Sequence, residues 1–153
     1  MTKVISSFIT IFLFSGVVAQ NAAPILLATG NQVYCPQSSL PIVTNMSITD
    51  PDDVGIAAMY IQISSGYVLG QDVLTLTGVH PTITSSWNAT EGKLSLSGVS
   101  GDPTYLQFKA AIESVVFTNS AINPSGQRIF SITVGQANYL ESTGHYYQYV
   151  PNT

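Results

Sequence analysis

Charged side chains are scarce in this chain of 153 residues. They make up 8% of it, with four Lys or Arg against eight Asp or Glu, while 45% of the residues are hydrophobic. Chains that stay unfolded usually combine high net charge with few apolar residues, so this one is expected to fold. Four cations cannot neutralise a run of phosphates, which argues against nucleic acids and anionic membrane surfaces as partners.

Cysteine is nearly absent as well. Cys35 is the single one, so the chain can form neither an internal disulfide nor a thiolate metal cluster. The Gln, Val and Tyr that precede it lack the small side chains of a lipid-attachment site. Two interpretations stay open: a small packed hydrophobic residue near a strand end, or a disulfide with another chain.

Motifs of hydrolytic enzymes are also missing. His80 and His145 are the only histidines, and neither belongs to an HxxxH, CxxC or GxSxG pattern. Glu91, Glu113 and Glu141 lie far apart in the sequence, with no pairing visible. We therefore expect a protein that is not an enzyme.

The first 19 residues have the pattern of a signal peptide. Lys3 supplies the positive charge, and residues 4–18 form an uncharged apolar stretch. Val17 and Ala19 are small enough for a signal peptidase, which predicts cleavage before Gln20. The alternative is a retained anchor, but fifteen residues fall short of the about 20 that span a bilayer core. Cleavage would leave a secreted protein with no stable membrane span.

Alternation of apolar and polar residues dominates the remaining sequence and indicates strands with one buried face. The hairpin loop 88–92, with Gly92 in a left-handed conformation, joins two such runs. The predicted strands are residues 41–48, 57–64, 72–77, 82–87, 93–97, 115–118 and 130–134. Their spacing predicts an all-β fold, an antiparallel β-sandwich of immunoglobulin-like or cadherin-like type.

One short helix is expected between the strands at residues 93–97 and 115–118. Asp102 suits the N-cap, and Pro103 suits the first helical position. Apolar residues then recur at spacings that can cover one end of a sandwich: Leu106, Phe108, Ile112 and Val115.

Five phrases follow one another between residues 47 and 134: SITDPDD, GQDVLTLTG, WNATEGKLSLSG, YLQFKAAIESVVFTN and NPSGQRIFSITV. In this order they resemble the cadherin-like repeat of large secreted bacterial surface proteins, which is related to the extracellular repeats of chondroitin-sulfate proteoglycan type. The resemblance covers about residues 40–136, after a lead segment at 20–39. It implies a structural and adhesive module that contacts neighbouring domains or other surface proteins.

The tail at residues 137–153 carries a second resemblance. QANYLESTGHYYQYV, at residues 136–150, is similar to the junction where flavobacterial surface proteins pass into a C-type-lectin-like domain. The alternative function that this implies is an N-terminal support domain of a carbohydrate-binding, lectin-like protein, with glycans bound through a domain missing from this chain. Tyr146, Tyr147 and Tyr149 would then form a strand that lacks its own sheet, and this strand should either be mobile or seek a partner edge.

Asp50, Asp52 and Asp53 place three carboxylates within four residues of a turn. Calcium binds several oxygen ligands, and the resemblance implies calcium in such inter-strand loops. The alternative is an Asp-Pro-Asp turn whose side chains bond nearby backbone N–H groups. Gln136 stands where an aspartate commonly follows the last strand in calcium-binding relatives, and this favours the turn.

Flat aromatic rings raise the possibility of sugar stacking. Trp87 shares a strand face with Ile83, which predicts a core or rim position. Tyr60 and Tyr67 are better candidates for exposure, although tyrosine is common on strand faces.

Overall fold

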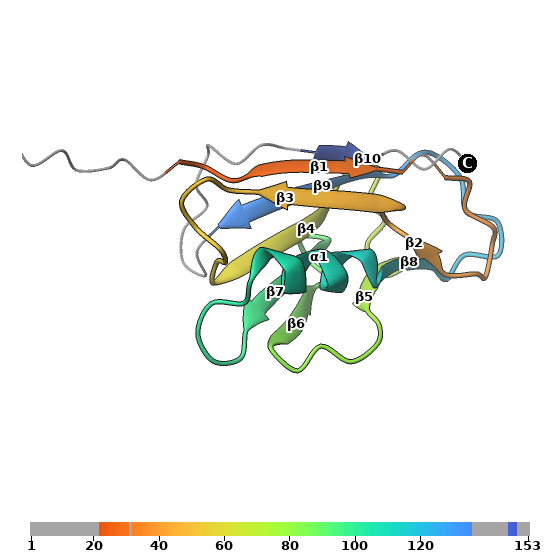
Figure 1. Ribbon diagram of the computed structural model, residues 1–153. Coiled ribbons are helices and arrows are strands. Elements are labelled where there is room, and N and C mark those ends of the chain that lie inside the picture. The colour runs from red at the N-terminus through yellow and green to blue at the C-terminus, as the bar shows by residue number, and fades with distance from the viewer. Residues whose placement is uncertain (1–21, 31, 136–146, 150–153) are drawn as a thin grey trace, which may run out of the picture.

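The computed structural model describes residues 22–30, 32–135 and 147–149 (Figure 1). The predicted signal peptide lies outside the described residues. The strands are β1 (Ile25–Thr29), β2 (Leu40–Pro41), β3 (Asn45–Thr49), β4 (Ala58–Ser65), β5 (Asp72–Leu76), β6 (Ile83–Asn88), β7 (Lys93–Gly98), β8 (Val115–Asn119), β9 (Ile129–Gly135) and β10 (Tyr147–Tyr149), and the helix is α1 (Tyr105–Glu113).

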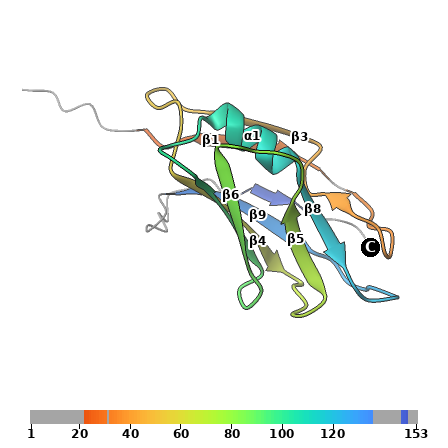
Figure 2. The same ribbon diagram turned by 90° about the horizontal axis from the view of Figure 1, so that it is seen from below.

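The strands form two packed layers. One is a five-stranded sheet in the order β10-β9-β4-β7-β6, and the other holds the sheets β2-β8-β5 and β1-β3. Every described pair of strands is antiparallel. In both views α1 lies on the side of β1 and β3 (Figures 1 and 2). The predicted fold class, an all-β antiparallel sandwich with one short helix, is confirmed.

The core lies between the layers because apolar residues alternate with polar ones along the strands and face inward. Met59, Ile61 and Ile63 of β4 are buried, as the period of two predicts. Phe117 of β8 and Phe130 of β9 meet edge to face across the layers, with their ring centroids 5.5 Å apart. Such aromatic pairs add to the stability that burial alone provides.

The segment at residues 20–39 is more than a lead into the sandwich. Leu26 and Ala28 of β1 are buried, and β1 pairs with β3 along its whole length. Tyr34 is buried as well, and its ring contacts Phe117 edge to face at 5.1 Å. The described residues of the predicted lead segment therefore belong to the sheets and to the core.

The predicted strand at residues 41–48 is wrong as a single element. β2 pairs with β8 in one sheet, whereas β3 pairs with β1 in another. Ile42 and Val43 lie between the two strands and are fully or almost fully buried. The chain crosses between sheets here, and apolar residues that serve both sheets carry no alternation to mark the break.

The predicted start of the helix is wrong too. The N-cap is Thr104, not Asp102, and Pro103 precedes the cap. The Thr104 side chain accepts the N–H of Gln107 at 3.2 Å, while the Gln107 side chain accepts the N–H of Thr104 at 2.8 Å. This reciprocal capping box satisfies two helix donors, which a cap at Asp102 would not do.

The helix also turns a different face to the core than expected. Leu106 is 75% exposed, although its spacing suggested a buried position. The buried residues of α1 are Tyr105, Phe108, Ala111 and Ile112, which share one side of the helix.

The predicted hairpin between β6 and β7 is confirmed. Asn88 lies opposite Lys93, and Gly92 has a φ of +63°. A Cβ on Gly92 would lie 2.9 Å from the ring of Tyr67, so this position requires glycine on steric grounds as well.

β10 does not stand apart from the sandwich. It pairs with the edge of β9, with Tyr147 opposite Ile132 and Tyr149 opposite Phe130. Of the two alternatives predicted for these residues, the structure shows the second, because β10 pairs with the partner edge that β9 offers.

Candidate functional site

The acidic loop, defined here as Asp50, Asp52 and Asp53, follows β3. One carboxylate oxygen from each residue lies within 4.8 Å of the others, as a shared cation would require. Asp50 is half-buried, whereas Asp52 and Asp53 are exposed.

Asp50 organises this loop through both of its oxygens. Its Oδ1 accepts the backbone N–H groups of Asp52 and Asp53, each at 3.1 Å. Its Oδ2 accepts the hydroxyl of Tyr105, the first residue of α1, at 2.8 Å. The side chain thus closes the turn and also ties it to the helix.

Backbone contacts fix the loop to the start of the helix. The N–H of Tyr105 donates to Val54 at 2.9 Å, and the N–H of Ile56 donates to Pro103 at 3.1 Å. Gly55 lies between these bonds and forms a bridge with Thr104. A Cβ on Gly55 would lie 2.4 Å from the carbonyl oxygen of Pro103, so no other residue allows this approach.

The acidic loop also meets the beginning of the described chain. The N–H of Ala22 donates to Oδ2 of Asp52 at 2.8 Å. Two residues 30 positions apart in the sequence therefore meet where the chain enters the sandwich.

The hydrogen bonds keep Asp50 ionised. Burial raises the pKa of Asp50, but the bonds from Asp52, Tyr105 and Asp53 outweigh burial and lower it from 3.8 to about 2. Burial raises the pKa of the Tyr105 phenol, and its bond to Asp50 and the nearby carboxylates raise it further. At neutral pH the pair is a carboxylate and a neutral hydroxyl donor.

Carboxylate oxygens are suitable ligands for a hard cation such as calcium, but this loop offers few that are free to bind one. Oδ1 of Asp50 already accepts two bonds and Oδ2 accepts one, which leaves Asp50 little capacity for a metal. Asp52 and Asp53 would supply most of the protein ligands. Calcium takes six to eight oxygens, so waters would complete the shell, as in extracellular sites with dissociation constants of about 0.1–1 mM.

Replacing Tyr105 with phenylalanine tests the Asp50 contact. We expect the free energy of unfolding to fall by about 1 kcal/mol at pH 7, because a hydrogen bond to a carboxylate is lost. A depressed pKa stabilises the fold above pH 3.8 and ceases to do so as pH falls through about 2. The cost of the substitution should therefore shrink between pH 4 and pH 2 in urea titrations.

Tyr67→Phe provides the matched control for that substitution. The Tyr67 hydroxyl donates to the neutral carbonyl of Ala89, so the cost of losing this bond should stay constant over the same pH range. An equal cost of Tyr105→Phe at pH 7 and pH 2 would show that Asp50 is not the acceptor.

A buried polar network lies at the end of the sandwich opposite the acidic loop, and the sequence analysis did not predict it. Asp72 and Arg128 are 1% and 5% exposed, and Nε of Arg128 donates to Oδ2 of Asp72 at 2.6 Å. Asn119 also donates to Asp72, and the N–H of Val68 donates to it at 2.7 Å. The network joins the starts of β5 and β9 to the end of β8.

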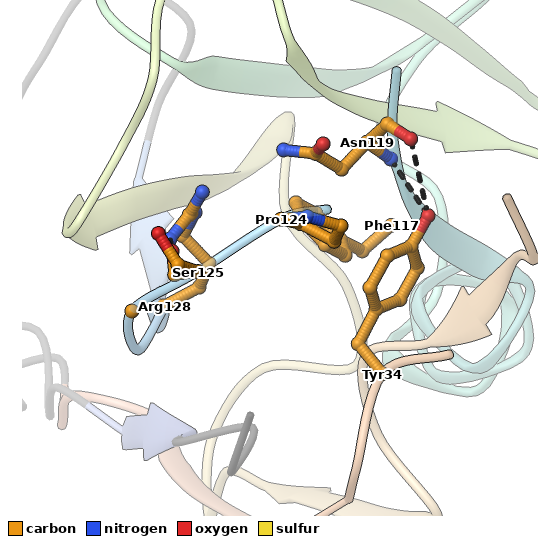
Figure 3. A pocket seen from close by; sticks show the side chains of 7 residues that line it. Tyr34, Phe117, Asn119, Pro124, Ser125 and Arg128 are labelled. Carbon is orange, nitrogen blue, oxygen red and sulfur yellow. Dashed lines mark hydrogen bonds between the residues drawn. The ribbon is translucent and has the colours of Figure 1, made fainter. Parts of the chain in front are cut away.

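A small pocket of about 230 Å³, part of it open solvent, borders this network (Figure 3). The hydroxyl of Tyr34 accepts the N–H of Asn119 at 3.0 Å, and Nη1 of Arg128 donates to Ser125 at 3.0 Å. Because these polar groups are already bonded within the protein, the pocket presents no evident ligand contacts.

The other candidate residues are dispersed. Nε2 of His80 lies 3.0 Å from the carbonyl oxygen of Thr77, which is a turn contact. Cys35 is exposed, so it is not the packed residue that one interpretation expected. Trp87 and Tyr67 are half-buried and meet edge to face at 6.2 Å, in keeping with the rim position predicted for Trp87. His145 lies outside the described residues.

Among the described residues, no helix has the length and apolar character needed to cross a bilayer.

No protein-family model matches this chain, and no solved structure matches it significantly. Halomucin of Haloquadratum walsbyi (strain DSM 16790 / HBSQ001) is 30% identical to it over 118 residues. The match covers 71% of this chain and 1% of halomucin. The chain is thus similar to a short stretch of a very long protein, and spans about 1% of that relative's length.

Proposed function

We propose that this protein is a non-catalytic extracellular module that spaces and supports neighbouring parts of a cell-surface protein. The observation that carries the proposal is the match of this chain to about 1% of the length of halomucin. The matched segment of 118 residues has the size of one domain, as expected of a single structural unit within a much longer protein.

The path of the chain supports a serial arrangement. β1 begins at the end of the sandwich that holds the acidic loop, since Ala22 bonds to Asp52. β10 points toward the opposite end (Figure 1). If the chain enters a module at one end and leaves it at the other, successive modules can be joined in a line by short connections.

The acidic loop would contribute by binding calcium. Asp52 and Asp53 would hold the ion beside the entering chain, and Asp50 would keep the turn in shape through its bonds to the backbone and Tyr105. The charge of the ion would offset the repulsion among three clustered carboxylates, and the entry point would be stiffened.

The location of the protein tests the proposal directly. Protease added to intact cells of the source organism should degrade the protein without lysis, and N-terminal sequencing of the protein from untreated cells should begin at Gln20. A cytosolic protein as control should survive the same treatment. A chain protected in intact cells that begins at Met1 would contradict an extracellular module.

A further inference from the structure

We propose that Asn88, at the end of β6, is the attachment site of an N-linked glycan. The acceptor pattern for such glycans is Asn-x-Ser/Thr, in which x is not proline. The chain has this pattern at Asn45 and Asn88, whereas Pro124 blocks it at Asn123. The proposal rests on the proposed export of the chain, because the transferases that attach N-linked glycans act on chains that have crossed a membrane.

The side-chain amide of Asn88 is held with its nitrogen available. Its Oδ1 accepts the backbone N–H of Thr90 at 3.0 Å and that of Glu91 at 3.3 Å. Because both partners are donors, the atom that faces them is the oxygen, and Nδ2 points away from them. Nδ2 is the atom that receives the sugar, and it makes no hydrogen bond within the part of the chain that the structure describes.

All three residues of this acceptor pattern lie at the surface. Asn88, Ala89 and Thr90 are exposed, in the turn that joins β6 to β7. The hydroxyl of Tyr67 donates to the carbonyl of Ala89 and so anchors the turn through its backbone. The side chains of Asn88 and Thr90 therefore stay accessible together, as a transferase that recognises both requires.

Asn45 offers a contrasting environment for the same pattern. Asn45, Met46 and Ser47 all belong to β3, and each is paired with a residue of β1. The Met46 side chain is 1% exposed and lies in the core. A transferase could engage this segment only by separating two strands and exposing Met46. In the folded chain Asn88 is accessible to the enzyme, and Asn45 is not.

The reaction needs an oligosaccharide carried on a lipid phosphate as its co-substrate. Nδ2 of Asn88 attacks the anomeric carbon of the first sugar, and a C–N bond forms. The C–O bond between that carbon and the phosphate breaks, and the lipid phosphate leaves with the bonding electron pair. The amide nitrogen gives up one proton, so the product is a neutral N-glycosyl amide.

Peptide mass spectrometry of the protein isolated from the source organism tests the proposal. A protease that cleaves before aspartate separates the two acceptor patterns, because one peptide ends at Thr49 and another covers residues 72–101. We expect peptide 72–101 to exceed its sequence mass by a whole number of sugar residues. The peptide that ends at Thr49 should have its sequence mass. N-terminal sequencing of the same sample should begin at Gln20.

Variants expressed in the source organism assign the added mass to Asn88. Asn88→Gln removes the acceptor nitrogen and should abolish the added mass. Thr90→Ala removes the hydroxyl that the transferase recognises and should abolish it too, although the N–H that Asn88 accepts remains in place. Thr90→Ser is the matched control and should retain the added mass. Asn45→Gln should leave it unchanged.

The outcomes separate failure of this proposal from failure of the proposed export. A chain that begins at Gln20 and has its sequence mass in peptide 72–101 would overturn the glycan while leaving the extracellular module intact. A chain that begins at Met1 would overturn both. Added mass that persists in Asn88→Gln and in Thr90→Ala would assign the sugar to another atom. Added mass on the peptide that ends at Thr49 would contradict the protection of Asn45 by strand pairing.

Discussion

Replacing Asp72 with alanine is expected to lower the free energy of unfolding by about 3–5 kcal/mol. The substitution leaves the guanidinium of Arg128, which is 5% exposed, buried without its carboxylate. Two further donors, the N–H of Val68 and the amide of Asn119, also lose their acceptor. Unpaired buried charge and unsatisfied donors are among the most costly defects in a protein.

A double variant separates the ion pair from the packing around it. Asp72→Ala combined with Arg128→Met should recover much of the loss, because removing both charges avoids an unpaired one. Glu113→Ala provides the surface comparison. It breaks a partly exposed pair with Lys109 on α1, and should cost about 0.3–0.5 kcal/mol.

Guanidinium chloride titrations of all three variants give the required comparison. A cost for Asp72→Ala no larger than that for Glu113→Ala would contradict the account, since it would mean that Arg128 escapes to solvent. The same titrations give the slope of the unfolding free energy against denaturant concentration. An unchanged slope shows that the unfolded states of the variants are comparable.

The strands could be predicted from the sequence wherever one face is buried and the other exposed. Met59, Ile61 and Ile63 alternate with polar residues, and Gly92 marks the hairpin between β6 and β7. The signal is local in both cases, since it depends on the period of the strand and on a left-handed glycine.

Features set by long-range contacts could not be predicted in this way. Tyr105 and Asp50 are 55 positions apart, and Arg128 and Asp72 are 56 apart, so no spacing pattern joins either pair. The predicted start of the helix was wrong for a related reason. An Asp-Pro pair and a Thr-x-x-Gln capping box compete within a few residues, and Thr104 is held by its bridge to Gly55 in a distant loop.

The acidic loop was found in the sequence, but its internal division of roles was not. The sequence gives no reason to distinguish the three aspartates. In the structure, Asp50 is the one that uses both carboxylate oxygens, one to close the turn and one to bind Tyr105. Removing Asp50 would therefore disturb the turn as well as any bound cation. A variant that tests calcium binding should spare it.

Thermal unfolding in excess calcium and in chelator tests the proposed calcium-stiffened module most directly. The most informative variant is Asp52→Ala with Asp53→Ala. It removes two carboxylates, but Asp50 can still accept the backbone N–H groups of residues 52 and 53. Glu91→Ala with Glu113→Ala is the matched control, because it removes the same charge from other surface positions.

The account predicts a rise in the unfolding temperature of the wild-type protein and of the Glu91/Glu113 control. An ion that binds only the folded state at about 100 times its dissociation constant adds about 2.7 kcal/mol. The rise should vanish in the Asp52/Asp53 variant. Equal unfolding temperatures of the wild-type protein in 10 mM calcium and in chelator would contradict the calcium site and leave the acidic loop as a turn.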